Sequence, residues 1–416
     1  MAFPDDYKSQ ARLAMETGDY GAAIRSLTEA IASERDNITL YFTRGLAYFM
    51  RKDYDLSIED LTAVLAVEHQ NEDALLTRAN AFFHTQQWDA ALQDYSEYIT
   101  ITAPTTALPY ERRAVIWTQL GDIPAALDDY NRAIEHSAEA GKYHFNRATL
   151  YYSSGNFEQT ITEASSAIDN NYPAPEVYAA RGSAYAQLKD WHLALDDYST
   201  ALDLDKRHAA TYYNRGAVHY QLGQLGAAIS DFTHALKIEG EDTVTLYARA
   251  IAYLDNNELR NARRDLSLII RHKPDHAAAY HKRGKVYLAD NKYDKALDDF
   301  EQAVRLANTM PEYLISLGEL EIELEMYEHA IGYFKRALIN HYSKTGLVYQ
   351  NALAGSALAY YLNTDDAQAI TYYNQLVAQD LAYGDSAFWQ TSFGWSDLLI
   401  EATHDMIAAI EAQIED

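Results

Sequence analysis

Several side chains in this sequence are of types that can transfer protons or hold a metal ion. Neighbouring acidic residues are the most frequent such pattern, at Asp128-Asp129, Asp196-Asp197 and Asp298-Asp299. Two adjacent carboxylates can act as acid and base or bind a cation. These pairs, however, recur at one position of a repeated segment, whereas an active site breaks the symmetry of a repeat. We therefore interpret them as structural residues.

The histidines give no stronger indication of a site. His272, His276 and His281 are close in sequence, but Pro274 interrupts the first two and no acidic residue shares a helix face with them. The chain has no cysteine, which excludes thiol nucleophiles and thiolate metal sites. Glycine-rich phosphate loops and the HExxH and GxSxG motifs are also missing. We predict that the chain is not an enzyme, with no catalytic residue, cofactor or metal.

Arginine and acidic residues recur together at a constant spacing. The arginines are Arg44, Arg78, Arg113, Arg147, Arg181, Arg215, Arg249 and Arg283, and the acidic residues are Asp60, Asp94, Asp129, Glu163, Asp197, Asp231, Asp265 and Asp299. A partly buried guanidinium requires a hydrogen-bonded counterion. We predict a structural ladder of ion pairs that fixes the geometry of the helices. A ladder of anion-binding sites is the alternative.

The ends of this series indicate which residues pair. Ser26 and Leu317 stand where the preceding acid and the following arginine are expected. Pairing between neighbouring segments would place Arg44 against Ser26 and Asp299 against Leu317, and both charges would lack a partner. Pairing within each segment leaves none alone, so we predict pairs such as Arg215 with Asp231.

The segments that carry these residues are copies of a 34-residue unit. We place eleven units at residues 4–37, 38–71, 72–105, 107–140, 141–174, 175–208, 209–242, 243–276, 277–310, 311–344 and 350–383. Position 8 of every unit is Gly or Ala, and position 20 is mostly Ala, which suits two closely crossing helices. Turn residues separate the two helices at Gly18, Gly121, Gly155, Gly223 and Asn291.

This pattern resembles the tetratricopeptide repeat, a helix-turn-helix unit of 34 residues. The resemblance implies an all-α fold, a right-handed α-solenoid superhelix in which the first helices line a concave groove. Register slips by one residue near Thr102–Ala107 and by five near Tyr342–Gly346. The pattern ends near residue 383, and we predict that residues 384–416 form a capping segment with a helix over 396–414.

By the same resemblance, positions 2, 5, 6, 9, 12 and 13 of the first helices face the groove. The candidate partner-binding residues there are Phe42, Phe49, Phe83, Phe145, Tyr152, Tyr213, Asn214, Tyr220, Tyr247, His281, Lys282 and Lys285. Aromatic anchors suit an extended peptide or a helix with apolar side chains. Packing against neighbouring side chains is the alternative role for these rings.

The charge of the chain distinguishes between classes of possible partner. The net charge is −27, which disfavours binding to nucleic acid. Residues 260–295 are nevertheless rich in Lys and Arg, and an acidic partner segment would fit there. No apolar run is long enough to insert into a membrane, and the N-terminus lacks the pattern of a secretory signal, so we predict a cytoplasmic location.

Taken together, these patterns predict a protein-protein interaction scaffold or adaptor that binds a peptide segment or a helix of partner proteins in its groove. A regulatory or substrate-recognition subunit of a separately encoded enzyme is one alternative, and a peptide sensor is another. The residues leave the partner and the oligomeric state open.

Overall fold

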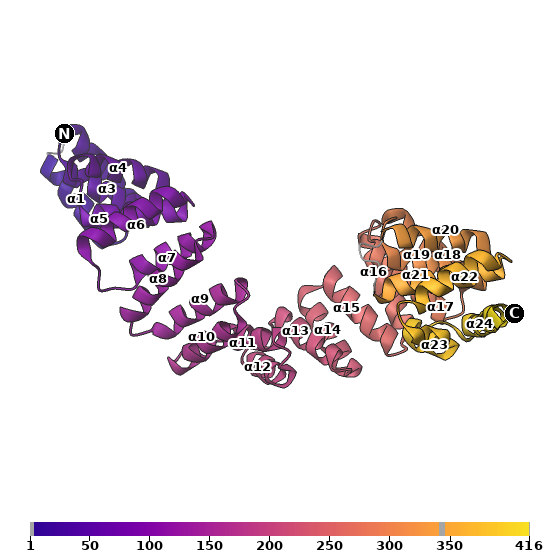
Figure 1. The fold of residues 1–416 in the computed structure, drawn as a ribbon. Helices are drawn as coiled ribbons and strands as arrows, with labels where there is room; N and C mark the ends of the chain where they lie inside the picture. The colour runs from indigo at the N-terminus through magenta and orange to yellow at the C-terminus, as the bar shows by residue number, and fades with distance from the viewer. Residues whose placement is uncertain (1–3, 341–345, 416) are drawn as a thin grey trace. The chain divides into compact units, whose positions relative to one another are not determined.

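All regular structure in the described part of the chain is helical. A computed structural model describes residues 4–340 and 346–415, which contain 24 α-helices, one 3-10 helix and no strand. Two compact bodies are present, Met1–Lys206 and Arg207–Asp416, and Figure 1 labels most helices of both. The prediction of an all-α fold built from helix pairs is confirmed, and each body is described by itself below.

Residues 4–206, the described part of the N-terminal body, contain twelve helices. They are α1 (Pro4–Glu16), α2 (Tyr20–Ser33), α3 (Ile38–Met50), α4 (Tyr54–Val67), α5 (Glu72–His84), α6 (Trp88–Thr102), α7 (Leu108–Leu120), α8 (Ile123–Glu135), α9 (Ala140–Ser153), α10 (Phe157–Asp169), α11 (Pro175–Gln187) and α12 (Trp191–Leu204). Odd-numbered and even-numbered helices form successive hairpins, and each hairpin packs against the next.

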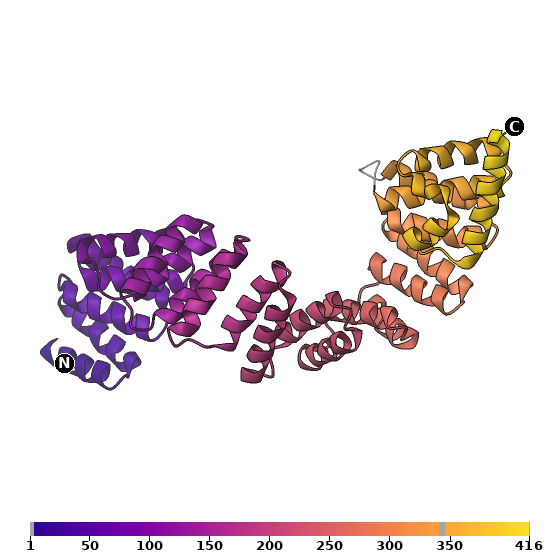
Figure 2. The same ribbon diagram turned by 60° about the horizontal axis from the view of Figure 1, so that its bottom comes forward.

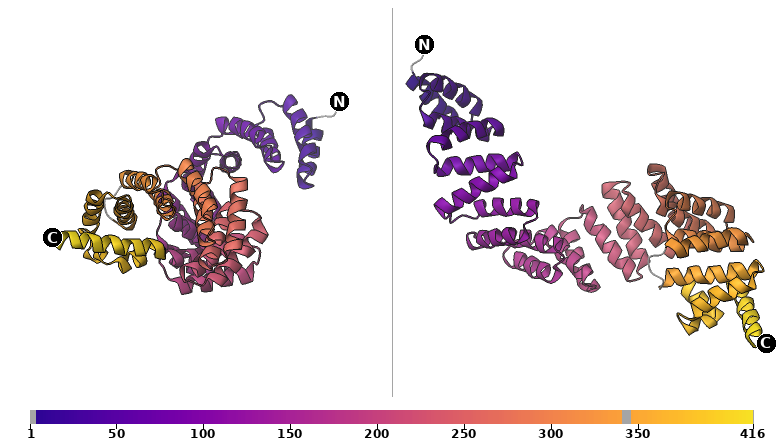
Figure 3. Two further views of the ribbon diagram at one scale, coloured as in Figure 1. Left: turned by 90° about the vertical axis from the view of Figure 1, so that its right-hand side faces the viewer. Right: turned by 45° about the horizontal axis from the view of Figure 1, so that its top comes forward.

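The described part of the C-terminal body continues the same arrangement. Its helices are α13 (Ala209–Gln221), α14 (Leu225–Glu239), α15 (Thr243–Asp255), α16 (Leu259–His272), α17 (Ala277–Ala289), α18 (Tyr293–Leu306), α19 (Pro311–Glu323), α20 (Tyr327–Asn340), α21 (Leu347–Leu362), α22 (Asp366–Val377), η1 (Leu381–Gly384), α23 (Ser386–Phe393) and α24 (Asp397–Glu415). Figure 3 shows the hairpins of each body side by side. Most of the predicted insertion at Tyr342–Gly346, and the end of the tenth unit, lie outside the described residues.

The turn inside each hairpin depends on one residue in the left-handed backbone region. It is position 15 of the unit in all eleven cases: Gly18, Lys52, Gln86, Gly121, Gly155, Lys189, Gly223, Asn257, Asn291, Glu325 and Thr364. The five positions expected from Gly and Asn are confirmed. Lys, Gln, Glu and Thr give no such indication in a sequence, because they rarely adopt positive φ.

Close packing between paired helices explains the small residue at position 8. A Cβ atom on Gly284 in α17 would lie only 2.6 Å from the ring of Phe300 in α18. Phe300 is fully buried at position 24 of the same unit. A glycine at position 8 therefore allows a whole aromatic ring to enter the space between the two helices.

The last helices do not continue the hairpin pattern. The helix predicted over 396–414 is present as α24, and it packs against α19 and α21, which are the first helices of units ten and eleven. In Figure 2 this yellow helix at the C-terminus runs across the stacked helices. The assignment of residues 384–416 as a cap stays a prediction, but the surface that α24 covers includes the faces of two first helices.

The residue at position 15 offers a test of this turn geometry. Thr364 has a φ of +62° and is β-branched, so replacement by glycine removes strain at the turn. We expect Thr364→Gly to raise the free energy of unfolding of the C-terminal repeats by about 1 kcal/mol. The measurement is thermal denaturation followed by circular dichroism.

The reverse substitution supplies the control. Gly223 has a φ of +70°, and no atom lies within 4 Å of the place that a Cβ atom would take, so strain alone decides the outcome of Gly223→Thr. This variant is expected to lower the melting midpoint. Equal effects of the two substitutions would contradict the strain argument.

Candidate functional site

The eight predicted arginines all pair with the acidic residue of their own unit. Nε and Nη2 of each arginine donate to the two carboxylate oxygens at 2.6–3.0 Å. The carboxylates are 1–12% exposed and the arginine side chains 11–22% exposed. Each pair thus joins the two helices of one hairpin through a nearly desolvated bidentate contact.

The arginines also contact the preceding unit, which the sequence reasoning missed. Nη1 donates to the side-chain oxygen at position 25 of that unit, where the acceptors are Thr28, Thr62, Ser96, Asn131, Ser165, Thr233 and Ser267. A signal was available, because position 25 is Ser, Thr or Asn in every unit that precedes an arginine-bearing unit. Unit nine, which precedes Leu317, has Glu301 there instead.

Aromatic rings enclose several of these guanidinium groups. The guanidinium carbon of Arg283 lies 5.5 Å from the ring centre of Tyr280 and 5.9 Å from that of Tyr287. Arg44 lies in the same way between Tyr41 and Tyr48. Cation-π contacts of this kind add to the ion pair. They leave little of the guanidinium open to an external anion, which favours the structural role of the ladder over anion binding.

Unit ten, which has no ladder pair, holds a buried acid instead. Glu321 in α19 is 3% exposed, and its Oε2 has no hydrogen-bond partner among the described residues. Its other oxygen lies 3.8 Å from Nδ1 of His329. Burial, with a smaller contribution from Glu301, raises the pKa of Glu321 to about 7. The stability of unit ten therefore depends on the protonation of this carboxyl group.

The predicted aromatic residues at position 12 divide into two groups. Phe49, Phe83 and Tyr152 pack edge-to-face against Tyr54, Trp88 and Phe157, with ring centres 5.5, 5.6 and 5.5 Å apart. These three partners open the second helix of the same unit. Such contacts match the packing alternative. Tyr220 lacks an aromatic residue at that position, where Leu225 stands, and it donates instead to Asp255 of the next unit.

Two of the predicted position-5 residues also contribute to packing. Phe42 joins the apolar cluster around Leu61 and Leu75, and Phe145 lies 6.1 Å from the ring of Tyr172. Both rings are half-buried. Contacts within the repeats thus already use part of each ring, and their role in binding a partner stays a prediction.

The assignment of His281 as a partner-facing residue is corrected by the structure. Its side chain is only 5% exposed, lies tilted against Tyr313 with ring centres 4.6 Å apart, and pairs with the Ser316 hydroxyl at 3.0 Å. Burial, with the nearby Lys285 and Lys282, lowers the pKa of His281 to about 3, so the ring is neutral. The next unit covers this histidine, because its partner Ser316 lies on α19.

Three of the predicted aromatic residues surround one pocket between α13 and α15. The pocket has a volume of about 490 Å³, and Tyr213, Tyr220 and Tyr247 line it together with Phe232 and Ile251. All three tyrosines are half-buried. Asn214 is also half-buried on α13 but does not line the pocket. The arrangement can accept a large apolar side chain among aromatic surfaces.

The hydroxyl groups of two tyrosines of this pocket, Tyr220 and Tyr247, stay protonated. Burial, followed by the hydrogen bond to Asp255, raises the pKa of Tyr220 to about 12. Burial and Tyr313 raise the pKa of Tyr247 to about 12. Tyr213 packs against Phe232 with ring centres 5.7 Å apart. Tyr220 and Tyr247 are thus uncharged at physiological pH, and both can offer apolar contact and a hydrogen-bonding hydroxyl group to a ligand.

Positive charge lies near the same pocket. Lys273 and His276 form part of its lining. Lys282 is half-buried in α17, and burial, followed by repulsion from Lys285, lowers its pKa. Lys285 is exposed and lines a separate small pocket with Glu312 and Glu319. Of the two predicted lysines, Lys282 therefore has the less favourable environment for its charge.

The remaining basic residues of 260–295 are partly neutralised by nearby acids. Arg263 lies 3.5 Å from Asp290, and His272 lies 2.6 Å from Glu241. The three clustered histidines have separate roles, because His276 caps α17 through Ala279 and His281 is buried. Within residues 4–340 and 346–415, no group of three or more His, Asp or Glu is placed to hold a metal ion.

The described α-helices have 8 to 19 residues. Within the part of the chain that the structure describes, none combines the length and the apolar character needed to cross a bilayer.

The repeat geometry defines a class of protein, the helical-repeat interaction proteins, and comparison with known families gives the particular one. Models of the tetratricopeptide repeat match residues 9–71, 53–105, 118–175, 247–311, 209–242 and 352–380, and a further TPR repeat model matches 182–223. One of these models alone spans more than half of the chain. The chain belongs to the tetratricopeptide repeat family, as its sequence pattern predicted.

Solved structures of the same repeat are similar to this chain. A C-terminal part of a repeat protein from Cytophaga hutchinsonii is 16% identical, with a TM-score of 0.49, covering 62% of this chain and 98% of its own. A repeat protein from Parabacteroides merdae is 20% identical, with a TM-score of 0.45, covering 60% and 98%. Yeast Tom70 is 16% identical, with a TM-score of 0.41, covering 99% and 96%. Among curated protein sequences, none matches.

The ladder can be tested at its least exposed pair, Arg249 with Asp265. Removing the arginine leaves a carboxylate that is 1% exposed without its counterion. We expect Arg249→Ala to lower the free energy of unfolding by about 3 kcal/mol, and Arg249→Ala with Asp265→Ala to lower it by less than the sum of the single variants. Thermal and urea denaturation of the four chains measure this coupling.

A milder variant isolates the contact between units. Thr233→Val keeps the shape of the side chain but removes the hydroxyl that accepts from Arg249 at 3.1 Å. The expected loss is about 1 kcal/mol. Strict additivity in the Arg249 and Asp265 cycle would contradict the pairing.

The buried acid of unit ten makes stability depend on pH. Because the folded pKa of Glu321 lies above the unfolded value of 4.5, the unfolded chain releases the proton first as pH rises. The folded state therefore loses up to about 3 kcal/mol of stability between pH 4.5 and pH 7. We expect Glu321→Gln to remove this loss, so that the variant melts higher than the natural chain at pH 8.

The same comparison below pH 4.5 is the control, because Glu321 is then protonated in both states. The difference between the two melting midpoints is expected to be small there. A difference that is constant from pH 4 to pH 8 would contradict the titration of Glu321.

Proposed function

We propose that this chain is a non-catalytic scaffold or adaptor that binds an extended segment or a helix of a partner protein at the pocket between α13 and α15. Repeat proteins of this family bind other proteins, and the observation that supports this place is the convergence of Tyr213, Tyr220 and Tyr247 on one open pocket of about 490 Å³. Rigid aromatic side chains supply contact area at a low cost in conformational entropy.

The tyrosines of this pocket differ from the other aromatic residues because they line an open space that a partner side chain can enter. Phe49, Phe83 and Tyr152 pack against the helix that follows them, whereas the α13 and α15 tyrosines line an open space. A large apolar side chain of the partner that enters this space would be removed from water on several sides. Burying such a side chain stabilises a complex by about 1.5–3 kcal/mol.

We further propose that acidic residues flank the apolar anchor of the partner. Lys273 lies at the pocket, and Lys282 lies near Asp255, which accepts the hydrogen bond from Tyr220. Since burial and Lys285 disfavour the charged form of Lys282, a carboxylate of the partner would relieve an existing cost. This gives the basic stretch 260–295 its role in orienting the segment.

Two alternatives use the same surface. In a recognition subunit of a separately encoded enzyme, the partner is that enzyme, and a stoichiometric complex would be recovered from the native host. In a peptide sensor, the repeats tighten on the ligand, and X-ray scattering in solution would show a smaller radius of gyration after binding. The cytoplasmic location stays a prediction alongside all three.

A peptide selection tests the pocket directly. The full chain is used to select binders from a random displayed peptide library, and the affinities of selected peptides are then measured by calorimetry. We expect the selected sequences to share a large apolar residue flanked by Asp or Glu. Tyr213→Ala with Tyr247→Ala is expected to weaken binding by about tenfold or more, because both rings line the pocket.

Matched variants separate the pocket from the rest of the surface. Tyr293→Ala removes a tyrosine that is 39% exposed at the start of α18, and it is expected to leave the affinity unchanged. Lys282→Glu with Lys285→Glu is expected to weaken binding and to reverse its response to salt. Unchanged affinity in the double tyrosine variant, with its helical content preserved, would refute the proposed site.

A further inference from the structure

The C-terminal segment contacts repeat positions of units ten and eleven that correspond to the lining of the open pocket. Nε1 of Trp395 donates to Oε1 of Glu319 at 2.9 Å and to Oδ1 of Asn351 at 3.1 Å. The hydroxyl of Ser396 donates to Oε1 of Glu323 at 2.5 Å. These three acceptors occupy positions 9, 2 and 13 of their units. In units seven and eight the same positions are held by Ala217, Val244 and Gln221, which line the pocket between α13 and α15.

The burial of equivalent residues differs between the two places. Ile315, Ile322 and Leu358 are at positions 5, 12 and 9, and they are 4%, 4% and 0% exposed. At positions 5 and 9 of units seven and eight, Tyr213 and Ile251 are only half-buried. Equivalent repeat positions thus form an open surface between α13 and α15 and a covered surface between α19 and α21.

The covering segment has the form of an amphipathic ligand helix. Ser396 accepts from the backbone of Leu399 and caps α24. One face of the helix is buried, namely Leu399, Thr403, Met406, Ile407 and Ile410. The opposite face exposes Glu401 and Asp405. This spacing is that of a helix that lays a single apolar face into a groove.

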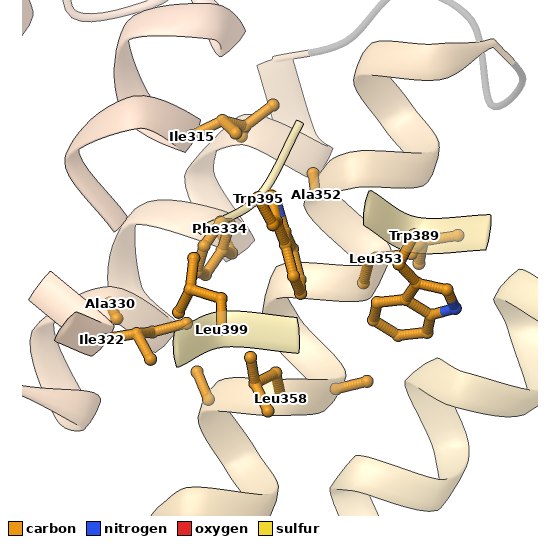
Figure 4. Close-up of a cluster of buried hydrophobic side chains, with 14 of the residues drawn as sticks. Ile315, Ile322, Ala330, Phe334, Ala352, Leu353, Leu358, Trp389, Trp395 and Leu399 are labelled. Atoms are coloured by element: carbon orange, nitrogen blue, oxygen red, sulfur yellow. The ribbon is translucent and has the colours of Figure 1, made fainter. Parts of the chain in front are cut away.

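Figure 4 shows how this segment enters the cluster. Trp395 and Leu399 project among Phe334 of α20, Ala352 of α21 and Ile322 of α19. The indole of Trp395 is 5% exposed, and Asn351 donates to the same Glu319 oxygen at 3.0 Å. A tryptophan therefore fills the space that an anchor residue of a partner fills in a groove-bound complex.

We propose that the α19/α21 face is a docking site for an amphipathic helix that begins with a tryptophan, and that the chain closes this site in cis with residues 395–410. The inference goes beyond the proposed function and does not depend on it, because it concerns different units. A partner that carries the same pattern, a tryptophan followed by one apolar helix face, would compete with α24 for this face.

The connection to the rest of the chain is compatible with release. Gly394, in the left-handed region at a φ of +67°, joins α23 to Trp395, and α24 has no hairpin partner within the described repeats. A short tether gives α24 an effective concentration on the order of mM at the α19/α21 face. A partner helix must compete with α24 at this effective concentration. The natural chain is therefore expected to bind a free helix only weakly.

The test uses the full chain and a labelled peptide with the sequence of residues 394–414. The chain is prepared as the natural sequence and as Trp395→Ala with Met406→Asp, which places a charge on the buried face of α24 and releases it. Because the peptide keeps Trp395 and Met406, we expect it to bind the variant at least tenfold more tightly than the natural chain. Fluorescence anisotropy measures the two affinities.

Three controls make the outcome specific. The peptide with Trp395→Ala is expected to lose binding to the variant chain. Leu266→Ala, which removes a buried side chain of α16 elsewhere in the body, is expected to bind the peptide no better than the natural chain. Circular dichroism of the variant chain confirms that its helices are retained. If the folded variant chain gains no affinity for the peptide, the proposal is overturned.

Hydrogen exchange on the natural chain keeps the proposal testable if the variant does not fold. A detachable helix opens without unfolding of the repeats beneath it. We therefore expect backbone amides of residues 400–410 to exchange at least tenfold faster than those of 352–360 in α21. Equal protection of the two segments would show that α24 is an integral part of the repeat core and would refute the inference.

Discussion

The arrangement of the repeats depends on how a nearly desolvated arginine satisfies its donors. Each ladder arginine uses Nε and Nη2 on the acid of its own hairpin, and Nη1 reaches the preceding unit where that contact is described, as from Arg249 to Thr233. A guanidinium group is planar, so these bonds cannot be adjusted independently. One side chain therefore sets the angle within a hairpin and the distance between neighbouring hairpins at the same time.

The end of this ladder coincides with a change in what the repeats do. In unit ten, Leu317 and Tyr333 replace the ion pair, and Glu321 stands as a buried acid with one oxygen that has no partner among the described residues. The same unit supplies Glu319 and Glu323 to the C-terminal segment. Without an arginine to fix its position, this part of the array is held by apolar burial, to which α24 contributes Leu399, Met406, Ile407 and Ile410.

Sequence reasoning was successful where the repeat imposes one residue type at one position. It predicted the helix pairs, the small residue at position 8 and the partner of each arginine. It did not indicate Lys52 or Thr364 as left-handed residues, because backbone strain tolerated within a fold leaves no mark on residue type. It misplaced His281, since the groove positions were taken from the resemblance to the repeat family, whereas in this chain the next unit covers the ring and Ser316 pairs with it. Periodicity also predicted α24 without indicating which helices it contacts.

Function in a repeat protein is concentrated where its symmetry is broken. Position 12 carries an aromatic residue in many units, yet the residue that opens the second helix decides its role. In three units the position-12 ring packs against the aromatic residue that opens the second helix, namely Tyr54, Trp88 or Phe157. In unit seven Leu225 stands there, and Tyr220 instead donates to Asp255 of the next unit and lines the pocket. An aliphatic residue at that position thus leaves the position-12 ring without its aromatic packing partner, and in unit seven that ring lines a pocket. The same reasoning applies at α19 and α21, where groove positions 9 and 2 hold the polar residues Glu319 and Asn351 and the chain's own Trp395 donates to both.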